Sequence, residues 1–199
     1  MTLQTYAGDQ IPPGDQVIEV HVSELGQIFN SMDPSPFHEK DLDDDAEQFI
    51  VGWAKELPRD APLALCVYLD KPSVTPEMAT ALRDAVHAFF QRQSEASRQR
   101  LRQLFRVGRT SLLIGLVFLA LCLLASHRVA KLWAGSGLAA VVRESLLIGG
   151  WVAMWRPLEI FLYDWWPIRN DRRLYGRLSR MPVRIVCPGE HPAPGQSSA

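Results

Sequence analysis

The chain contains little cysteine and no paired cysteine motif. Its three cysteines, Cys66, Cys122 and Cys187, lie far apart within the 199 residues. A small disulfide-linked scaffold normally uses an even set of cysteines at short spacings, so these positions argue against a disulfide framework. The scattered thiols are instead typical of a protein in a reducing compartment.

The sequence also lacks the common signature motifs of enzymes. It contains no GxSxG nucleophile elbow, no Walker loop, no GxGxxG dinucleotide fingerprint, and no HExxH or CxxC metal motif. We therefore predict no enzymatic activity, no catalytic residue, no bound metal and no cofactor. The first sixteen residues are polar and lack the apolar core of a cleavable signal peptide.

Acidic and basic residues are segregated along the chain, although the formal net charge is only -1. The early part is acid-rich, and the later part carries two blocks of arginine: Arg98, Arg100, Arg102, Arg106 and Arg109, then Arg169, Arg172, Arg173, Arg177 and Arg180. Both blocks adjoin apolar runs. Membrane orientation therefore explains them with fewer assumptions than nucleic-acid binding does, and we predict no nucleic-acid partner.

The first apolar run has no charged residue and no polar stripe. It covers residues 110–126, and at 1.5 Å per residue it approaches the ~30 Å hydrocarbon core of a bilayer. Flanking residues extend it, so we predict the first transmembrane helix over residues 107–130. A buried core helix of a soluble protein would normally carry a polar stripe.

A second apolar stretch, residues 137–166, is interrupted by charges. A charge at mid-bilayer costs about 2.5–3.5 kcal/mol. A span from Gly137 to Trp155 places Arg143 and Arg156 toward opposite faces, where both side chains reach water. Proline in a helix interior kinks or breaks the helix, so Pro157 predicts a kink followed by an interfacial end. A longer kinked helix that carries Arg156 deeper remains an alternative.

Two sets of residues on this second segment are candidates for function. Arg156 and Glu159 are i, i+3 neighbours and, with Asp164, form a candidate membrane ion pair. We interpret the pair as an anchor of depth, with a transport role as the alternative. The candidate membrane-interface anchors are Trp151, Trp155, Trp165 and Trp166.

The two arginine blocks also predict an orientation. Both lie at the outer sequence ends of the two apolar segments, whereas the connection, residues 131–136, is short. The positive-inside rule therefore places both termini in the cytoplasm and residues 131–136 outside.

The remaining sequence predicts a small α+β domain. Three segments have strand character: Val17–Val22, Pro62–Asp70 (buried on both faces) and Met181–Pro188. An amphipathic helix is predicted over residues 46–57, and a second begins at Pro76, with Thr75 as its N-cap, and continues into the first span.

The predicted fold is thus a membrane α-helical hairpin with a small α+β cytoplasmic domain. Residues 17–106 form the domain, and residues 167–188 add a helix and a strand that pack on it. Residues 1–16 are expected to be a flexible N-terminus, and the Pro- and Ser-rich residues 189–199 a disordered tail.

The densest polar cluster lies in "FNSMDPSPFHEKDLDDD". Its prolines and aspartates predict turns and an acidic helix cap. A proline-stiffened loop is also a candidate partner-docking site, formed by Met32, Asp33, Phe37, His38 and Asp41. A metal site using Asp33, His38 and Glu39 is the remaining alternative, although the spacing matches no EF-hand.

The segments "SMDPSPFHEKDLDDDAEQFI" and "WRPLEIFLYDWWPIRNDRRLYGRL" resemble a group of two-pass bacterial inner-membrane proteins. This resemblance covers most of the chain and implies a bacterial inner membrane, but it implies no activity. We expect a non-enzymatic scaffold or docking protein in the lipid bilayer, with a protein partner or a homo-oligomer. The alternatives are a subunit of an oligomeric channel or transporter, and a membrane-tethered metal-dependent enzyme.

Overall fold

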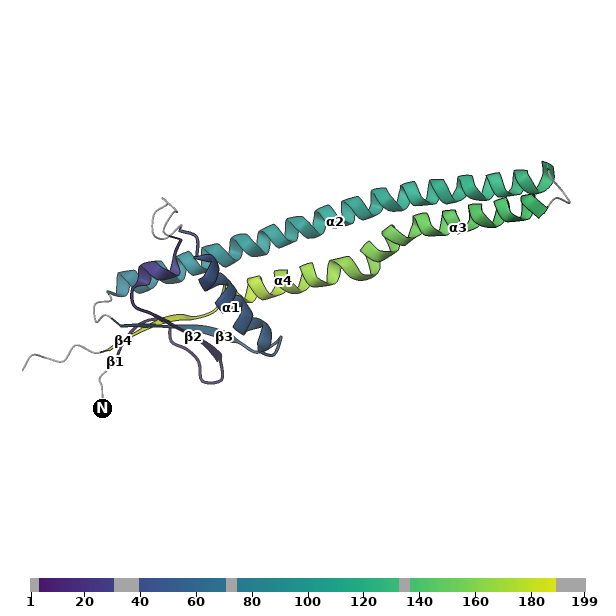
Figure 1. The fold of residues 1–199 in the computed structure, drawn as a ribbon. Helices are drawn as coiled ribbons and strands as arrows, with labels where there is room; N and C mark the ends of the chain where they lie inside the picture. Colours follow the sequence, from purple (N-terminus) through teal and green to yellow (C-terminus); the bar gives the residue numbers. More distant parts are fainter. Residues whose placement is uncertain (1–3, 31–39, 71–74, 133–136, 189–199) are drawn as a thin grey trace, which may run out of the picture. The chain divides into compact units, whose positions relative to one another are not determined.

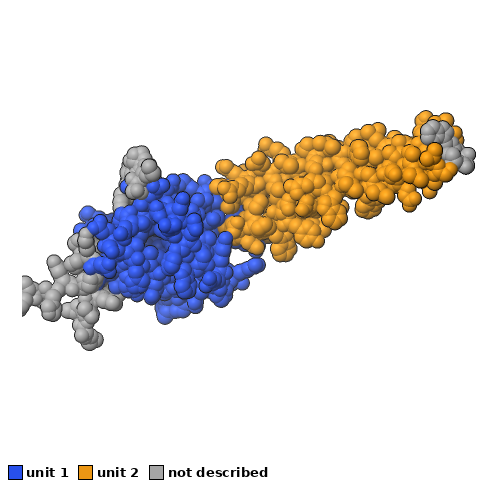
Figure 2. All heavy atoms as spheres, in the orientation of Figure 1, with its two compact units in different colours: residues 1–95, 172–199 blue, residues 96–171 orange. Residues whose placement is uncertain are grey.

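The structure is a computed structural model that describes residues 4–30, 40–70, 75–132 and 137–188. The chain divides into two compact units (Figure 2). Unit 1 comprises residues 1–95 and 172–199, and unit 2 comprises residues 96–171. The predicted tail, residues 189–199, lies outside the described residues, as do residues 133–136 of the predicted external loop.

The described part of the chain is mostly helical, with a small four-stranded mixed sheet (Figure 1). The strands are β1 (Gln4–Gly8), β2 (Gln16–Val22), β3 (Leu63–Leu69) and β4 (Val183–Pro188). The helices are the short 3-10 helix η1 (Leu25–Ile28), α1 (Asp44–Glu56), α2 (Pro76–Leu132), α3 (Gly137–Glu159), the π-helical turn η2 (Ile160–Asp164) and α4 (Trp165–Leu178).

The sheet of unit 1 has the strand order β1-β4-β3-β2. β3 pairs in parallel with both β2 and β4, and β1 pairs antiparallel with β4. The prediction that the segment ending at Pro188 joins the first two strands is confirmed. Because β4 lies between β3 and β1, the chain completes this sheet only after it has passed through unit 2.

All three helices of unit 1 pack on one face of the sheet. The core combines alternate strand residues with α1, the start of α2 and the end of α4, and its largest fully buried side chains include Ile18, Ile50, Leu65, Phe90, Leu178 and Ile185. β3 is also buried on its other face, where Ala64 and Cys66 are 0% and 4% exposed. The prediction that this strand is buried on both faces is confirmed.

The predicted start of α2 is confirmed, whereas α1 begins at Asp44, two residues before its predicted start and within the acidic segment. Asp43 is the N-cap of α1, and its carboxylate accepts a hydrogen bond from the Asp45 amide at 3.2 Å. Thr75 caps α2, because its Oγ1 accepts from the Met78 amide at 3.3 Å, and Pro76 is the first helical residue. Side-chain acceptors at these positions satisfy amides that have no partner within the helix.

The N-terminal residues differ from the prediction. Residues 1–16 were expected to be flexible, but residues 4–8 form β1, and Asp9 fixes its end. Asp9 exchanges hydrogen bonds with Val183, donating from its amide to the Val183 carbonyl (2.9 Å) and accepting from the Val183 amide (3.3 Å). Arg83 of α2 donates to the same Asp9 carboxylate at 3.2 Å. The segment is ordered by partners that are remote in sequence.

The helix around Pro157 is not broken, which agrees with the longer helix given as the alternative prediction, and the depth of Arg156 stays a prediction. The α-helical conformation continues through Pro157 to Glu159, so the proline does not end α3. The π-helical turn η2 follows directly and leads into α4. A π turn inserts an extra residue into the helical repeat, which allows a helix to continue where the α-helical hydrogen-bond pattern is disturbed.

Candidate functional site

Unit 2 exposes a large apolar surface. Two helical segments, Pro76–Leu132 and Ala140–Leu178, are long and apolar enough to cross a membrane. Within them, large side chains are turned outward: Leu113 and Ile114 of α2 are each 64% exposed, and Trp155 of α3 is 72% exposed. Contiguous apolar surface of this kind mostly marks contact with a lipid or protein environment.

Small residues allow α2 and α3 to approach each other closely. A Cβ on Gly108 would lie 2.8 Å from Cγ2 of Ile160, and one on Gly150 would lie 2.7 Å from Cδ1 of Leu119. A methyl group at either position would therefore require the facing side chain to shift. Gly108 lies within the first arginine block, whereas Gly150 lies within the second apolar stretch.

Gly115 lies opposite the segment that contains the proline. A Cβ at Gly115 would come within 3.2 Å of the Ala153 carbonyl oxygen and 3.7 Å of the Pro157 ring. The Ala153 carbonyl is the one that would accept an N–H from residue 157 in a regular α-helix, and proline has none. The glycine thus gives the disturbed turn of α3 room against α2.

These contacts fix the level of the charged residues along the hairpin. Gly115 faces Pro157, and Gly108 faces Ile160. Arg156 and Glu159 therefore lie between the levels of Gly108 and Gly115, where the uncharged run of residues 110–126 begins. Arg156 and Glu159 are therefore at one end of the shared apolar stretch rather than at its centre.

The predicted ion pair is formed. Nη1 of Arg156 lies 2.9 Å from Oε2 of Glu159 and 3.6 Å from Oδ2 of Asp164. The bridge to Glu159 joins i, i+3 neighbours, and the second contact crosses the π turn to the residue at its end. Two carboxylates thus share one guanidinium, which suits a set of charges that would be costly to bury singly.

The tryptophans predicted as interface anchors fall into two groups. Trp151, Trp155 and Trp166 are exposed. Trp165 is partly buried; its indole N–H donates to the Phe161 carbonyl at 2.9 Å, and the Arg169 guanidinium lies 5.4 Å from its ring centre. Their role at a membrane interface remains a prediction, since an indole with an apolar body and a polar edge suits that position.

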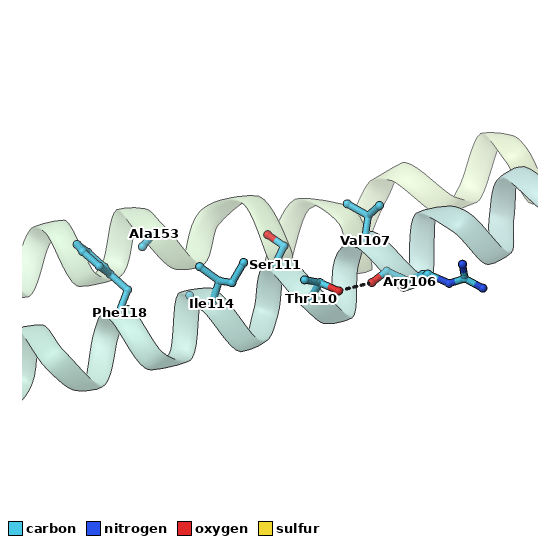
Figure 3. A pocket seen from close by; sticks show the side chains of 8 residues that line it. Arg106, Val107, Thr110, Ser111, Ile114, Phe118 and Ala153 are labelled. Carbon is cyan, nitrogen blue, oxygen red and sulfur yellow. Dashed lines mark hydrogen bonds between the residues drawn. The ribbon is translucent and has the colours of Figure 1, made fainter.

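An open groove of about 630 Å³ runs along α2 in unit 2. The residues that line it include Arg106, Thr110, Ser111, Ile114, Phe118 and Ala153. Arg106 and Phe118 lie at opposite ends, and the Thr110 hydroxyl donates to the Arg106 carbonyl at 3.1 Å (Figure 3). This groove was not predicted from the sequence; of the residues that line it, only Ala153 comes from α3.

Most of the candidate docking loop lies outside the described residues, including Met32, Asp33, Phe37 and His38. Glu39 of the alternative metal site also lies outside them. Asp41 is described, and its carboxylate lies 2.5 Å from Nη2 of Arg92 on α2. Asp41 is therefore engaged with α2, and the docking prediction for the loop remains a prediction.

His21 and His87 of unit 1 both have structural contacts. Nε2 of His87 lies 2.7 Å from the Met181 carbonyl oxygen. Because a carbonyl oxygen only accepts, the ring N–H donates this hydrogen bond. The ring of His21 stacks on Tyr68 with centroids 4.6 Å apart. Within the described ranges, no group of three or more His, Cys, Asp or Glu residues is arranged to hold a metal ion.

Burial changes the acidity of two neighbouring groups on β3. It raises the pKa of the Cys66 thiol, and all three cysteines are buried and free, which agrees with the absence of a disulfide framework. Burial, followed by the nearby Cys66 and Glu19, raises the pKa of Tyr68 to about 12. Desolvation disfavours the charged thiolate and phenolate. These two groups are therefore neutral near pH 7, which is unlike an activated nucleophile.

Comparison with known proteins does not assign the chain to a family. No protein family, no curated protein and no solved structure matches the chain.

Proposed function

We propose that the chain is a two-pass protein of a bacterial inner membrane whose α+β unit lies in the cytoplasm and docks or scaffolds a protein partner. The observation that carries this proposal is the outward-facing apolar surface of unit 2 on two helices of membrane-spanning length. Without a surrounding apolar medium, side chains such as Leu113, Leu124 and Trp155 would remain in contact with water, at a cost that grows with their area.

The orientation rests on the charges. No aspartate or glutamate occurs between residues 96 and 132, so the arginines of the first block are not balanced within their own helix. The second block follows the second apolar stretch and has five arginines against one acidic residue, Asp171. Arginine flanking both outer ends of the hairpin supports cytoplasmic termini.

Membrane insertion and topology are tested separately. Alkaline carbonate washing of bacterial membranes should leave the full chain in the pellet, and its release would contradict the proposal. A periplasm-active reporter inserted after Ala134 should be active, whereas the same reporter at the C-terminus should be silent. The reverse pattern would overturn the orientation but not the insertion.

The docking role is tested by purification in mild detergent. A defined second protein at fixed stoichiometry would support a scaffold, and a pure homo-oligomer would contradict it. A pure oligomer favours the second candidate, a channel or transporter subunit, for which the triad of Arg156, Glu159 and Asp164 is the specific observation. Arg156→Gln combined with Glu159→Gln should then abolish flux; in a scaffold the same change should only weaken insertion.

A further inference from the structure

We propose that the groove on α2 is a binding site for one anionic phospholipid of the cytoplasmic leaflet, with its phosphate at Arg106 and an acyl chain along the groove. This inference rests on the membrane placement proposed above and adds a ligand to it. Three observations carry it: the chemistry of the lining, its order along the helix, and the charge around Arg106.

The charged and hydroxyl-bearing side chains of the lining lie toward one end, with Val107 beside them, and the other end is apolar. Arg106 lies at one end, the hydroxyls of Thr110 and Ser111 follow, and Ile114 and Phe118 complete the far end (Figure 3). A phospholipid has the same order of groups, namely a charged phosphate, polar ester linkages and a hydrocarbon chain. A helix or strand of a protein partner has no reason to present its groups in that order.

The length of the groove also fits. Residues 106 and 118 are twelve positions apart, which in an α-helix corresponds to about 18 Å. Half of a bilayer's hydrocarbon core is about 15 Å. A chain anchored at Arg106 would therefore extend along the groove to about the middle of the membrane, where Phe118 lies.

The charge of Arg106 has no counter-ion within the part of the chain that the structure describes. Its own helix carries no carboxylate after Glu95, and the nearest acidic residues of α3 and η2, Glu159 and Asp164, are engaged by Arg156. An unpaired arginine at the edge of an apolar surface attracts an anionic headgroup and binds its phosphate in bidentate fashion. The headgroup of a zwitterionic lipid should bind Arg106 more weakly.

Two pairs of variants separate this site from general lipid contact. Arg106→Gln removes the proposed phosphate ligand, and Arg109→Gln is its control, because Arg109 carries the same charge one turn away and does not line the groove. Ser111→Phe obstructs the groove. Its control is Ala120→Phe, since nine residues place that exposed position on the opposite side of α2.

The test is native mass spectrometry of the full chain in mild detergent, titrated with phosphatidylglycerol or phosphatidylcholine of identical acyl chains. We expect one tightly retained phosphatidylglycerol per chain and weaker phosphatidylcholine binding. Arg106→Gln should weaken phosphatidylglycerol binding about fivefold, the factor expected for one arginine near an anionic headgroup. Ser111→Phe should weaken both lipids, and the two controls should change either affinity less than twofold.

Several outcomes would overturn the inference. Equal binding of the two lipids, or an Arg106→Gln variant that binds like the parent, would exclude an anionic headgroup site. A dimer that carries no lipid and dissociates in Ser111→Phe would assign the groove to a second copy. Displacement of the bound lipid by inorganic phosphate alone would indicate that the site binds a free anion rather than a lipid. If carbonate washing releases the chain from membranes, the proposed function fails as well; if the chain stays membrane-bound, only the lipid site fails.

Discussion

Gly8 is the residue with the narrowest choice of side chain in unit 1. Its φ of +106° lies in a region that side chains rarely adopt, and a Cβ there would lie 2.6 Å from the Val183 carbonyl oxygen. Gly14 has a similar φ of +112°, but nothing lies within 4 Å of its Cβ position. Comparing substitutions at the two glycines therefore separates the effect of backbone strain from that of steric exclusion by the sheet.

We expect Gly8→Ala to destabilise unit 1 more than Gly14→Ala does. Backbone strain should cost each variant about 1–3 kcal/mol. Gly8→Ala adds a collision with a backbone atom that cannot move aside, worth another ~1–3 kcal/mol. Thermal unfolding of the full chain, followed by circular dichroism, measures the difference. Equal melting temperatures for the two variants would show that β1 is not held against β4 as described.

Tyr68 makes alkaline stability depend on one side chain. Its hydroxyl donates to Oε1 of Glu19 at 3.4 Å, and its pKa is raised from 10 to about 12. Below pH 10 the phenol is neutral in both states. Between pH 10 and about 12 it ionises only in the unfolded chain, so the free energy of unfolding falls across this window.

Tyr68→Phe should remove that part of the pH dependence. The variant's free energy of unfolding, measured by urea denaturation from pH 9 to 12, should fall less steeply than that of the parent chain. Other tyrosines and lysines affect both proteins alike and cancel in the comparison. Parallel pH profiles would mean that Tyr68 titrates normally in the folded protein.

The individual elements show which parts of the fold can be predicted from the sequence. β3 was predicted because its apolar run is continuous, and α1 because its apolar residues repeat at helical spacing. β1 was missed because "QTYAG" is short and has no apolar pattern; it pairs with β4 from the far end of the chain. Pro157 was expected to disrupt α3, but Gly115 on the facing helix and the following π turn accommodate it.

The candidate sites also differ in how far they can be predicted from the sequence. Arg156 and Glu159 were paired from their i, i+3 spacing alone, because that contact depends only on one helix. The approach of Asp164 depends on η2, which no local rule predicted. The groove at Arg106 was missed altogether, because its lining combines residues of α2 with Ala153 of α3, whose position against α2 no local pattern predicts. Contacts within one helix can be predicted from the spacing of residues in the sequence. Features shared by two helices also depend on how the two helices are aligned against each other.

The hairpin element yields a prediction about its glycines. Gly108→Ala places a methyl 2.8 Å from Cγ2 of the buried Ile160, a β-branched side chain with few alternative rotamers. We expect a loss of about 1–3 kcal/mol in hairpin stability. Gly149→Ala is the matched control, because nothing lies within 4 Å of its Cβ position and alanine favours the helix by roughly 0.5–1 kcal/mol.

Gly150→Ala should fall between these two variants. Its new methyl meets the Cδ1 atom of Leu119 at 2.7 Å, and the end of a leucine side chain can rotate away. Melting temperatures in detergent should therefore increase in the order Gly108→Ala, Gly150→Ala, Gly149→Ala. A Gly108→Ala protein as stable as the Gly149→Ala protein would contradict the described register of α2 against α3.

For the whole molecule, the order of the chain matters most. Residues 1–95 supply three strands, but β4, between β3 and β1, comes from residues after unit 2. Residues 1–95 alone would leave β3 with an unpaired edge and β1 without its only neighbour in the sheet. Exposed edges of this kind promote aggregation. The α+β unit is thus completed by the segment that follows the hairpin.

Unit 1 should nevertheless fold without the hairpin if its two segments are joined. The Ser94 hydroxyl lies 3.4 Å from the Arg172 carbonyl oxygen, so a short Gly-Ser linker can connect residue 95 to residue 172. We expect this joined protein to be soluble and monomeric and to unfold cooperatively, whereas residues 1–95 alone should aggregate. Size-exclusion chromatography and thermal unfolding distinguish the two. A soluble, cooperatively folded 1–95 fragment would show that β4 is dispensable, and an aggregated joined protein would show that the α+β unit depends on unit 2 for more than the delivery of β4.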